Sequence, residues 1–204
     1  EELTKKDMKE SDRDELVRVA TVATQKLGNI VNAFSEIARI EDGQLDFRFE
    51  TMELVDFIDR MVKEAEPVAK QYGSQLHFDR PADGILVLGD PIKMEMVMSN
   101  LINNGIKYNK QGGAVMIRVR QLTGERAVEV SVEDSGIGLS PEDKAHMFEK
   151  YYRADEAKRI NTAGSGLGLY LVKQVMLQHH GKVWVDSIQG RGSTFHFILP
   201  TRAK

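Results

Sequence analysis

A polar stretch between Asn100 and Tyr108 has residue types and a spacing suited to binding a ligand. Asn100 and Asn104 are four residues apart, so on a helix their side chains lie one above the other, with Lys107 one turn further along. An asparagine carbonyl is an oxygen ligand that Mg²⁺ accepts, and a lysine ammonium can meet phosphate charge. This face suits a polyphosphate with its metal ion, and the alternative is a solvated helix face with no ligand.

A second stretch, residues 134–138 (Asp-Ser-Gly-Ile-Gly), follows the end of an expected strand. The carboxylate of Asp134 can accept a hydrogen bond from the amino group of adenine, and Gly136 and Gly138 let the backbone approach a flat base. Guanine has a carbonyl at the same place, so such a site would reject GTP. The alternative is a turn built on Asp-Ser-Gly chemistry.

A third stretch, residues 164–169 (Gly-Ser-Gly-Leu-Gly-Leu), opens an expected helix. A glycine-rich entry to a helix offers free N–H groups and the positive end of the helix dipole to phosphates. The sequence contains no Gly-Lys-Ser or Gly-Lys-Thr, no His-Arg-Asp and no Asp-Phe-Gly, which excludes a P-loop and a protein-kinase site. A dinucleotide motif starting at Gly166 would need its third glycine at Leu171, so that fold is excluded too.

Apolar periodicity predicts the elements that must position these stretches. A helix opens at Asp90 and Pro91 as N-cap and first helical residue. Its expected buried residues are Met94, Val97, Met98, Leu101 and Ile102. Strands are expected at 45–49, 75–79, 85–88, 114–122, 126–133, 182–187 and 193–200, further helices at 54–72, 141–148 and 167–179, and a mobile loop at 149–164. From residue 44 onward the chain is therefore predicted to be α+β, a two-layer α/β sandwich with helices on one face of a mostly antiparallel sheet.

The first 43 residues have a different pattern. Apolar residues repeat at spacings of four and three, as in a coiled-coil helix, at Leu16, Ala20, Ala23, Leu27, Ile30, Phe34 and Ile37. Asp42 and Gly43 supply a helix stop. A narrow apolar seam needs partner helices, so we expect residues 1–43 to be the second helix of a helical dimerisation hairpin. The alternative is a helix packed on its own domain.

Composition limits the partners. With 31 acidic and 28 basic residues the net charge is −3, so no basic field is available to hold nucleic acid. The 204 residues include no cysteine, which excludes disulfides and thiolate zinc sites. No apolar run is long enough to span a bilayer and the start is no signal peptide. Because the chain begins in mid-pattern without an initiator methionine, we expect a fragment of a longer protein.

Four stretches in order, residues 100–108, 134–138, 148–153 and 164–169, resemble the N box, first glycine box, F box and second glycine box of sensor histidine kinases. The resemblance covers nearly the whole chain, since residues 16–47 look like the second helix of that family's dimerisation domain. It implies the Bergerat ATP-binding fold, which is shared with DNA gyrase, and Mg²⁺ and ATP as ligands.

The resemblance also implies residue roles. Asn104 would be the Mg²⁺ ligand, Asn100 its neighbour on the nucleotide, and Asp134 the residue that reads adenine. Lys107 and Tyr108 would contact phosphate and nucleoside, and Arg153 would face the γ-phosphate when the lid of residues 149–164 closes. Gly136 and Gly138 would let the base approach the backbone. The phosphates would be cradled by Gly164, Gly166, Leu167 and Gly168. Asn104, Lys107 and Arg153 would carry catalysis.

The activity implied is transfer of the ATP γ-phosphoryl group to a histidine, for relay to an aspartate on a response-regulator receiver domain. The family's His-Glu-x-Arg-Thr-Pro box is missing from this sequence, so the helix that carries the acceptor histidine is expected upstream. The protein is expected to be a homodimer in the cytoplasm, or the cytoplasmic part of a membrane-anchored sensor. His77, His146, His179, His180 and His196 are expected to be structural or surface residues. Two alternatives remain: an inactive pseudokinase or nucleotide-sensing module, and a serine kinase of the anti-sigma type, which needs no coiled-coil helix.

Overall fold

A computed structural model of the chain describes residues 47–123, 125–160 and 164–201, together with residues 13, 16–21, 24, 28, 31, 34, 35, 38 and 39. The described residues before position 40 are all helical, including Leu16, Ala20 and Phe34 of the predicted seam. The other seam residues, Ala23, Leu27, Ile30 and Ile37, and the predicted stop at Asp42 and Gly43 lie outside the described residues.

The remaining elements alternate between strands and helices. In chain order they are β1 (Glu50–Glu53), α2 (Leu54–Gln71), β2 (Gln75–Asp79), β3 (Leu86–Gly89), α3 (Pro91–Lys107), β4 (Ala114–Gln121), β5 (Ala127–Asp134), α4 (Pro141–His146), α5 (Asp155–Ile160), α6 (Gly168–Gln178), β6 (Lys182–Ile188) and β7 (Gly192–Pro200). Most predicted elements are confirmed with ends shifted by one or two residues.

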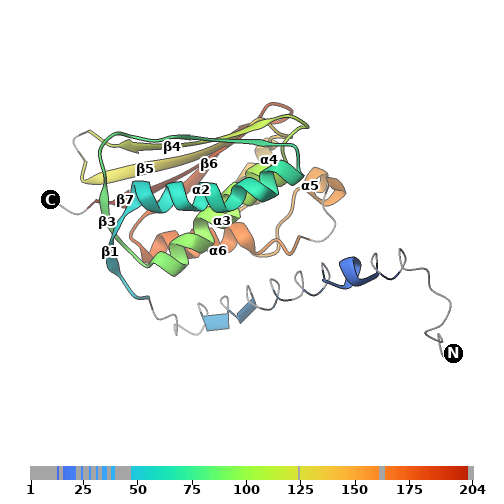
Figure 1. Ribbon diagram of the computed structural model, residues 1–204, viewed down its shortest axis with the longest axis horizontal. Helices are drawn as coiled ribbons and strands as arrows, with labels where there is room; N and C mark the ends of the chain where they lie inside the picture. The colour runs from blue at the N-terminus through green and yellow to red at the C-terminus, as the bar shows by residue number, and fades with distance from the viewer. Residues whose placement is uncertain are drawn as a thin grey trace.

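The main sheet has five strands in the order β2-β4-β5-β7-β6. Only β2 pairs in parallel, with β4, and the other three pairings are antiparallel. A separate antiparallel pair joins β1 to β3. Helices α2, α3 and α6 lie together on one face of the main sheet (Figure 1). The predicted two-layer α+β sandwich with a mostly antiparallel sheet is confirmed.

Helix α3 forms the centre of the helical layer because one face is apolar throughout. All five residues predicted for that face, Met94, Val97, Met98, Leu101 and Ile102, are at most 1 % exposed. The helix begins as predicted, since the side chain of Asp90 accepts from the backbone N–H of Lys93 and Pro91 takes the first position. Burial of one face leaves the opposite polar face of α3 directed away from the core.

Two sequence predictions are wrong. Residues 47–49 are not a strand, because β1 begins only at Glu50. The backbone N–H of Arg48 donates instead to Asp90, and the ring of Phe47 packs against His179. The expected loop at 149–164 contains helix α5, a six-residue helix without apolar periodicity that is stabilised by the ion pairs Lys158–Asp155 and Arg159–Glu156.

Candidate functional site

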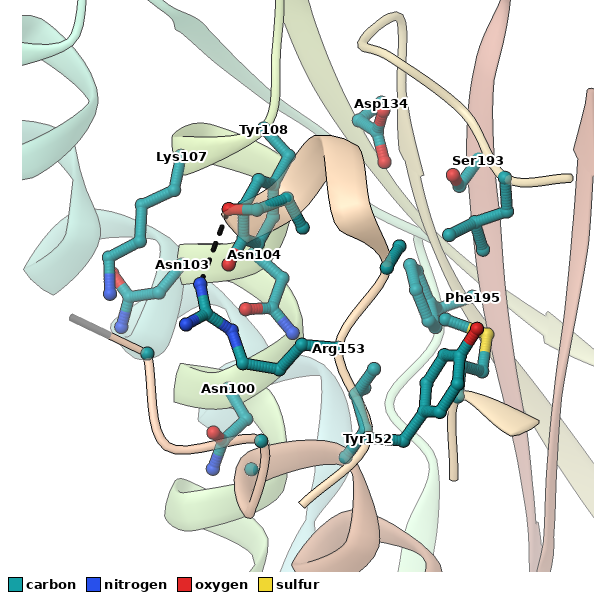
Figure 2. A pocket seen from close by; sticks show the side chains of 18 of the residues that line it. Asn100, Asn103, Asn104, Lys107, Tyr108, Asp134, Tyr152, Arg153, Ser193 and Phe195 are labelled. Carbon is teal, nitrogen blue, oxygen red and sulfur yellow. Dashed lines mark hydrogen bonds between the residues drawn. The ribbon is translucent and has the colours of Figure 1, made fainter. Parts of the chain in front are cut away.

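A cavity of about 580 Å³ lies between the polar face of α3, the end of β5 and the segments on either side of α5. Figure 2 shows side chains from these elements converging on it. It brings together ten of the predicted site residues: Asn100, Asn104, Lys107, Tyr108, Asp134, Gly138, Arg153, Gly164, Gly166 and Gly168. Gly136 and Leu167 are not among its lining residues, and Leu167 is buried against Leu171.

Asp134 is the last residue of β5 and is only 8 % exposed. Its Oδ1 accepts from the backbone N–H of Gly136 at 2.8 Å, and the backbone of Ser193 on β7 also donates to the carboxylate. Burial raises the pKa of Asp134 to about 6, although these two hydrogen bonds act in the opposite direction. A buried carboxylate thus faces the cavity with part of its accepting capacity unused by the protein backbone.

The raised pKa makes stability depend on pH. Over the range between the unfolded value of 3.8 and about 6, the folded state keeps a proton that the unfolded state has released. Stability therefore falls as the pH rises through this range, and above it the buried charge costs about 3 kcal/mol.

We expect Asp134→Asn to raise the free energy of unfolding at pH 8 by up to about 3 kcal/mol and to change it little at pH 4. The amide keeps the shape and one acceptor oxygen but carries no charge to bury. Urea denaturation at the two pH values measures the difference. Asp83→Asn is the control, because Asp83 is an exposed carboxylate in the segment between β2 and β3. An equal gain at both pH values would show that charge burial is not the cause.

Gly136 and Gly138 lie where two backbone segments come very close. A Cβ added at Gly136 would be 2.0 Å from the carbonyl oxygen of Tyr108, and one at Gly138 would be 2.1 Å from the carbonyl oxygen of Ile188. The amide of Ile137 between them donates to the Tyr108 oxygen at 3.1 Å. These contacts hold the loop after β5 against the end of α3 and against the end of β6, so the structure gives both glycines a packing role.

We expect Gly136→Ala to destabilise the fold by about 2 to 3 kcal/mol, because its Cβ meets backbone atoms that cannot rotate away. Denaturation followed by circular dichroism measures the change. Gly28→Ala is the control, since no atom of the described residues lies within 4 Å of a Cβ placed there and alanine favours a helix. A Gly136→Ala variant within about 0.5 kcal/mol of the original protein would contradict the tight contact.

The polar face of α3 forms one wall of the cavity. The amide nitrogen of Asn100 donates to the Met96 carbonyl at 2.8 Å, and its Oδ1 is directed at the start of α6, 2.3 Å from where a Cβ of Gly168 would be. Glycine at this position lets the two helices approach. Asn104 and Lys107 follow on the same face, and both line the cavity.

Arg153, from the segment just before α5, also lines the cavity (Figure 2). Its Nη2 donates to the carbonyl of Ala157 in α5 at 3.3 Å, and its guanidinium packs where a Cβ of Gly164 would lie 3.1 Å away. Tyr151, two residues before Arg153, adopts a positive φ of 67°, which is rare for a residue with a large side chain. The chain around Arg153 is thus held in a strained conformation of the kind found at functional sites.

Tyr152 is one of several cavity residues that the sequence analysis missed. Its hydroxyl donates to Asp143 of α4 at 2.8 Å, which raises the pKa of Tyr152 to about 12. Other missed residues are Ser99, Asn103, Ser193 and Phe195. The spacing of four between Ser99 and Asn103, which hydrogen bond to each other, was a usable signal.

Comparison with known proteins identifies the family. Residues 89–203, more than half of the chain, match the family described as "Histidine kinase-, DNA gyrase B-, and HSP90-like ATPase", so the chain belongs to this family. It is 35 % identical over 183 residues to the sensor-like histidine kinase SenX3 of Mycobacterium bovis, covering 88 % of this chain and 43 % of SenX3. It is 30 % identical over 177 residues to the sensor histidine kinase WalK of Bacillus subtilis, covering 87 % of this chain and 29 % of WalK.

Among solved structures, the mycobacterial sensor histidine kinase MprB superposes with a TM-score of 0.63 at 27 % identity, covering 77 % of this chain and all of that one. The chain thus contains the ATP-binding catalytic module of a sensor histidine kinase, and it spans less than half the length of SenX3 and WalK. Within the described residues, no helix is both long and apolar enough to cross a membrane.

Proposed function

We propose that this domain binds Mg·ATP and transfers the γ-phosphoryl group to a histidine that is not one of the five in this chain. In that reaction the bond between the γ-phosphorus and the β–γ bridging oxygen breaks, a nitrogen–phosphorus bond forms, and ADP leaves. The observation that carries the proposal is the buried carboxylate of Asp134, which lies across the 580 Å³ cavity from the amide and ammonium groups of α3.

The adenine end of the site is assigned to Asp134. Its carboxylate would accept from the adenine amino group, and Ile137, Met147 and Phe195 supply apolar cavity walls for the base. A guanine carbonyl at this position would face an acceptor without a donor, so we propose that GTP is rejected.

The phosphate end is assigned to the polar face of α3 and to the segments around α5. Asn104 would contribute one carbonyl oxygen to Mg²⁺, with phosphate oxygens and water completing the coordination that this ion prefers. Lys107 and Arg153 supply positive charge toward the phosphates, and Gly164, Gly166 and Gly168 let the backbone approach them. Bound Mg²⁺ would neutralise charge that develops on the transferred group.

Transfer to an outside acceptor is favoured over hydrolysis. Among the described residues that line the cavity, Asp134 is the one carboxylate, and histidine is not represented. In the ATP-hydrolysing members of the superfamily that the sequence resembles, a glutamate four residues before the metal-binding asparagine activates water. This chain has Asn100 there, and an amide cannot act as a general base. The site would therefore position ATP for attack by a nucleophile from outside the cavity.

We further propose that residues 1–43 form the second helix of a dimerisation hairpin, that residues 44–204 form the catalytic domain, and that the protein acts on the cytoplasmic side as a homodimer. A response-regulator receiver domain would then take the phosphoryl group. Leu16 and Phe34, at 59 % and 58 % exposed, support a partner helix for the seam.

The test is phosphorylation of a chain extended at its N-terminus through the preceding acceptor helix. With γ-labelled ATP and Mg²⁺, this chain should acquire phosphate that is labile in acid and stable in alkali, as expected for phosphohistidine. Labelled GTP is the control and should give no incorporation. ATP binding without acid-labile phosphate would reject the kinase proposal in favour of an inactive nucleotide-sensing module.

A further inference from the structure

A buried histidine outside the cavity is not used by the proposed reaction. His179 follows the end of α6 and is 2 % exposed. Its Nδ1 lies 2.8 Å from the carbonyl oxygen of Val175, and its Nε2 lies 3.0 Å from the backbone nitrogen of Asp90. Because a carbonyl only accepts and an amide only donates, the proton is assigned to Nδ1 and Nε2 is the acceptor. Burial lowers the pKa of His179, which favours this neutral form.

The residue that His179 holds is the N-cap of α3. Asp90 is 4 % exposed and uses its two carboxylate oxygens for different segments. Oδ1 accepts from the backbone N–H of Lys93 at 3.1 Å, which caps α3, and Oδ2 accepts from the backbone N–H of Arg48 at 2.8 Å. One side chain thus ties the segment that enters the domain to the helix that carries the polar cavity face.

Aromatic contacts reinforce this connection on both sides of Arg48. The rings of Phe47 and Phe49 stack at 5.6 Å between centroids, and each also contacts the imidazole of His179, at 5.6 Å and 4.9 Å. Space here is limited, since a Cβ added at Gly89 would lie 3.4 Å from the imidazole. The entering segment is therefore held by one backbone hydrogen bond and two ring contacts, all centred on His179 and Asp90.

We propose that His179 and Asp90 form a clamp that fixes residues 47–49 to the start of α3, and that this clamp sets the direction from which the preceding chain approaches the nucleotide cavity. The effect of the clamp on phosphoryl transfer rests on the proposed function, because the acceptor histidine is expected in the preceding chain. His179 and Asp90 are positioning residues in this scheme, since neither lines the cavity. The clamp would keep the acceptor within reach of the γ-phosphate.

Two substitutions separate the clamp from helix capping. In Asp90→Ser, the serine hydroxyl can still cap α3 at Lys93, but serine has no second oxygen at the position of Oδ2, which accepts from Arg48. In His179→Phe, the ring contacts remain while the acceptor for the Asp90 amide is lost. His179→Gln is the conservative variant, because its amide oxygen can reach the position of Nε2. His77→Phe, at an exposed position of β2, is the matched control.

The first measurement is amide hydrogen exchange in the present chain, together with calorimetric titration of Mg·ATP. We expect the Arg48 amide to exchange about tenfold faster or more in Asp90→Ser and His179→Phe, with partial recovery in His179→Gln and no change in His77→Phe. Mg·ATP affinity should stay within about twofold in all four. An Arg48 amide that exchanges at the original rate in both Asp90→Ser and His179→Phe would overturn the clamp.

The second measurement is single-turnover phosphoryl transfer at saturating Mg·ATP in the extended chain. Asp90→Ser should slow transfer about tenfold without changing nucleotide affinity, a separation that a general loss of stability would not produce. If the Arg48 amide exchanges faster but the rate of phosphoryl transfer is unchanged, the positioning role of His179 and Asp90 would be overturned. If the unsubstituted extended chain transfers no phosphate, the proposed function fails, and the exchange data still decide whether the clamp exists.

Discussion

Asp134→Asn is expected to weaken Mg·ATP binding about 100-fold and to remove the preference for ATP over GTP. The backbone N–H groups of Gly136 and Ser193 both donate to this carboxylate, so the amide oxygen of the new side chain would be held toward these two donors. The amide nitrogen would then face the cavity as a donor. A donor there opposes the amino group of adenine and suits the carbonyl of guanine, which removes the basis for preferring ATP that we assign to the carboxylate.

Calorimetric titration of Mg·ATP and Mg·GTP into the two proteins at pH 8 measures this change. The same substitution is expected to raise stability at that pH, so lost binding cannot be ascribed to unfolding. Glu133→Gln removes a neighbouring charge outside the cavity and should bind ATP as the original protein does. Undiminished ATP affinity in Asp134→Asn would mean that the base is read elsewhere.

The α3 wall of the cavity could be predicted because its signals are local. Asp90 and Pro91 mark the start of the helix, and the apolar period fixes which face is buried. The position of Asn100, Asn104 and Lys107 on the remaining face then follows from helix geometry alone. The chemistry expected of that face stays a prediction, whereas its location on the cavity wall is a finding.

The sheet wall could not be predicted in the same way. Ser193 lies beside Asp134 because β5 and β7 pair in one particular register, and no local pattern encodes that register. Phe195 enters the cavity for the same reason, two residues further along β7. Residues brought together by non-local strand pairing carry no spacing signal in the sequence.

Two local sequence patterns, the alternation at residues 45–49 and the glycine at position 136, are each compatible with more than one structural cause. Alternating residues at 45–49 suggested a strand, yet Phe47 and Phe49 are placed by packing on His179. Gly136 suggested a base that approaches the backbone, yet the atom closest to its missing Cβ is the carbonyl oxygen of Tyr108. In both cases the decisive neighbour comes from a distant part of the chain, so the sequence pattern alone is ambiguous.

Asn104→Ala is expected to slow phosphoryl transfer by about 100- to 1,000-fold in the extended chain. Asn104 lines the cavity on the polar face of α3, where its carbonyl would bind Mg²⁺. Alanine keeps the helix, because it has the highest helix propensity, and it removes the oxygen. The loss should therefore appear in Mg²⁺-dependent steps and leave recognition of the base intact.

Two readouts test this separation. The rate of acid-labile phosphate formation should fall and should require more Mg²⁺ for half saturation, while metal-free ADP should bind within about twofold of its original affinity. Asn103→Ala is the matched control, since Asn103 is adjacent on α3 and its amide donates to Ser99. Equal losses in the two variants would mean that the polarity of the helix face, and not a metal contact at Asn104, supports transfer. Weaker binding of metal-free ADP in Asn104→Ala would place this side chain on the nucleotide itself.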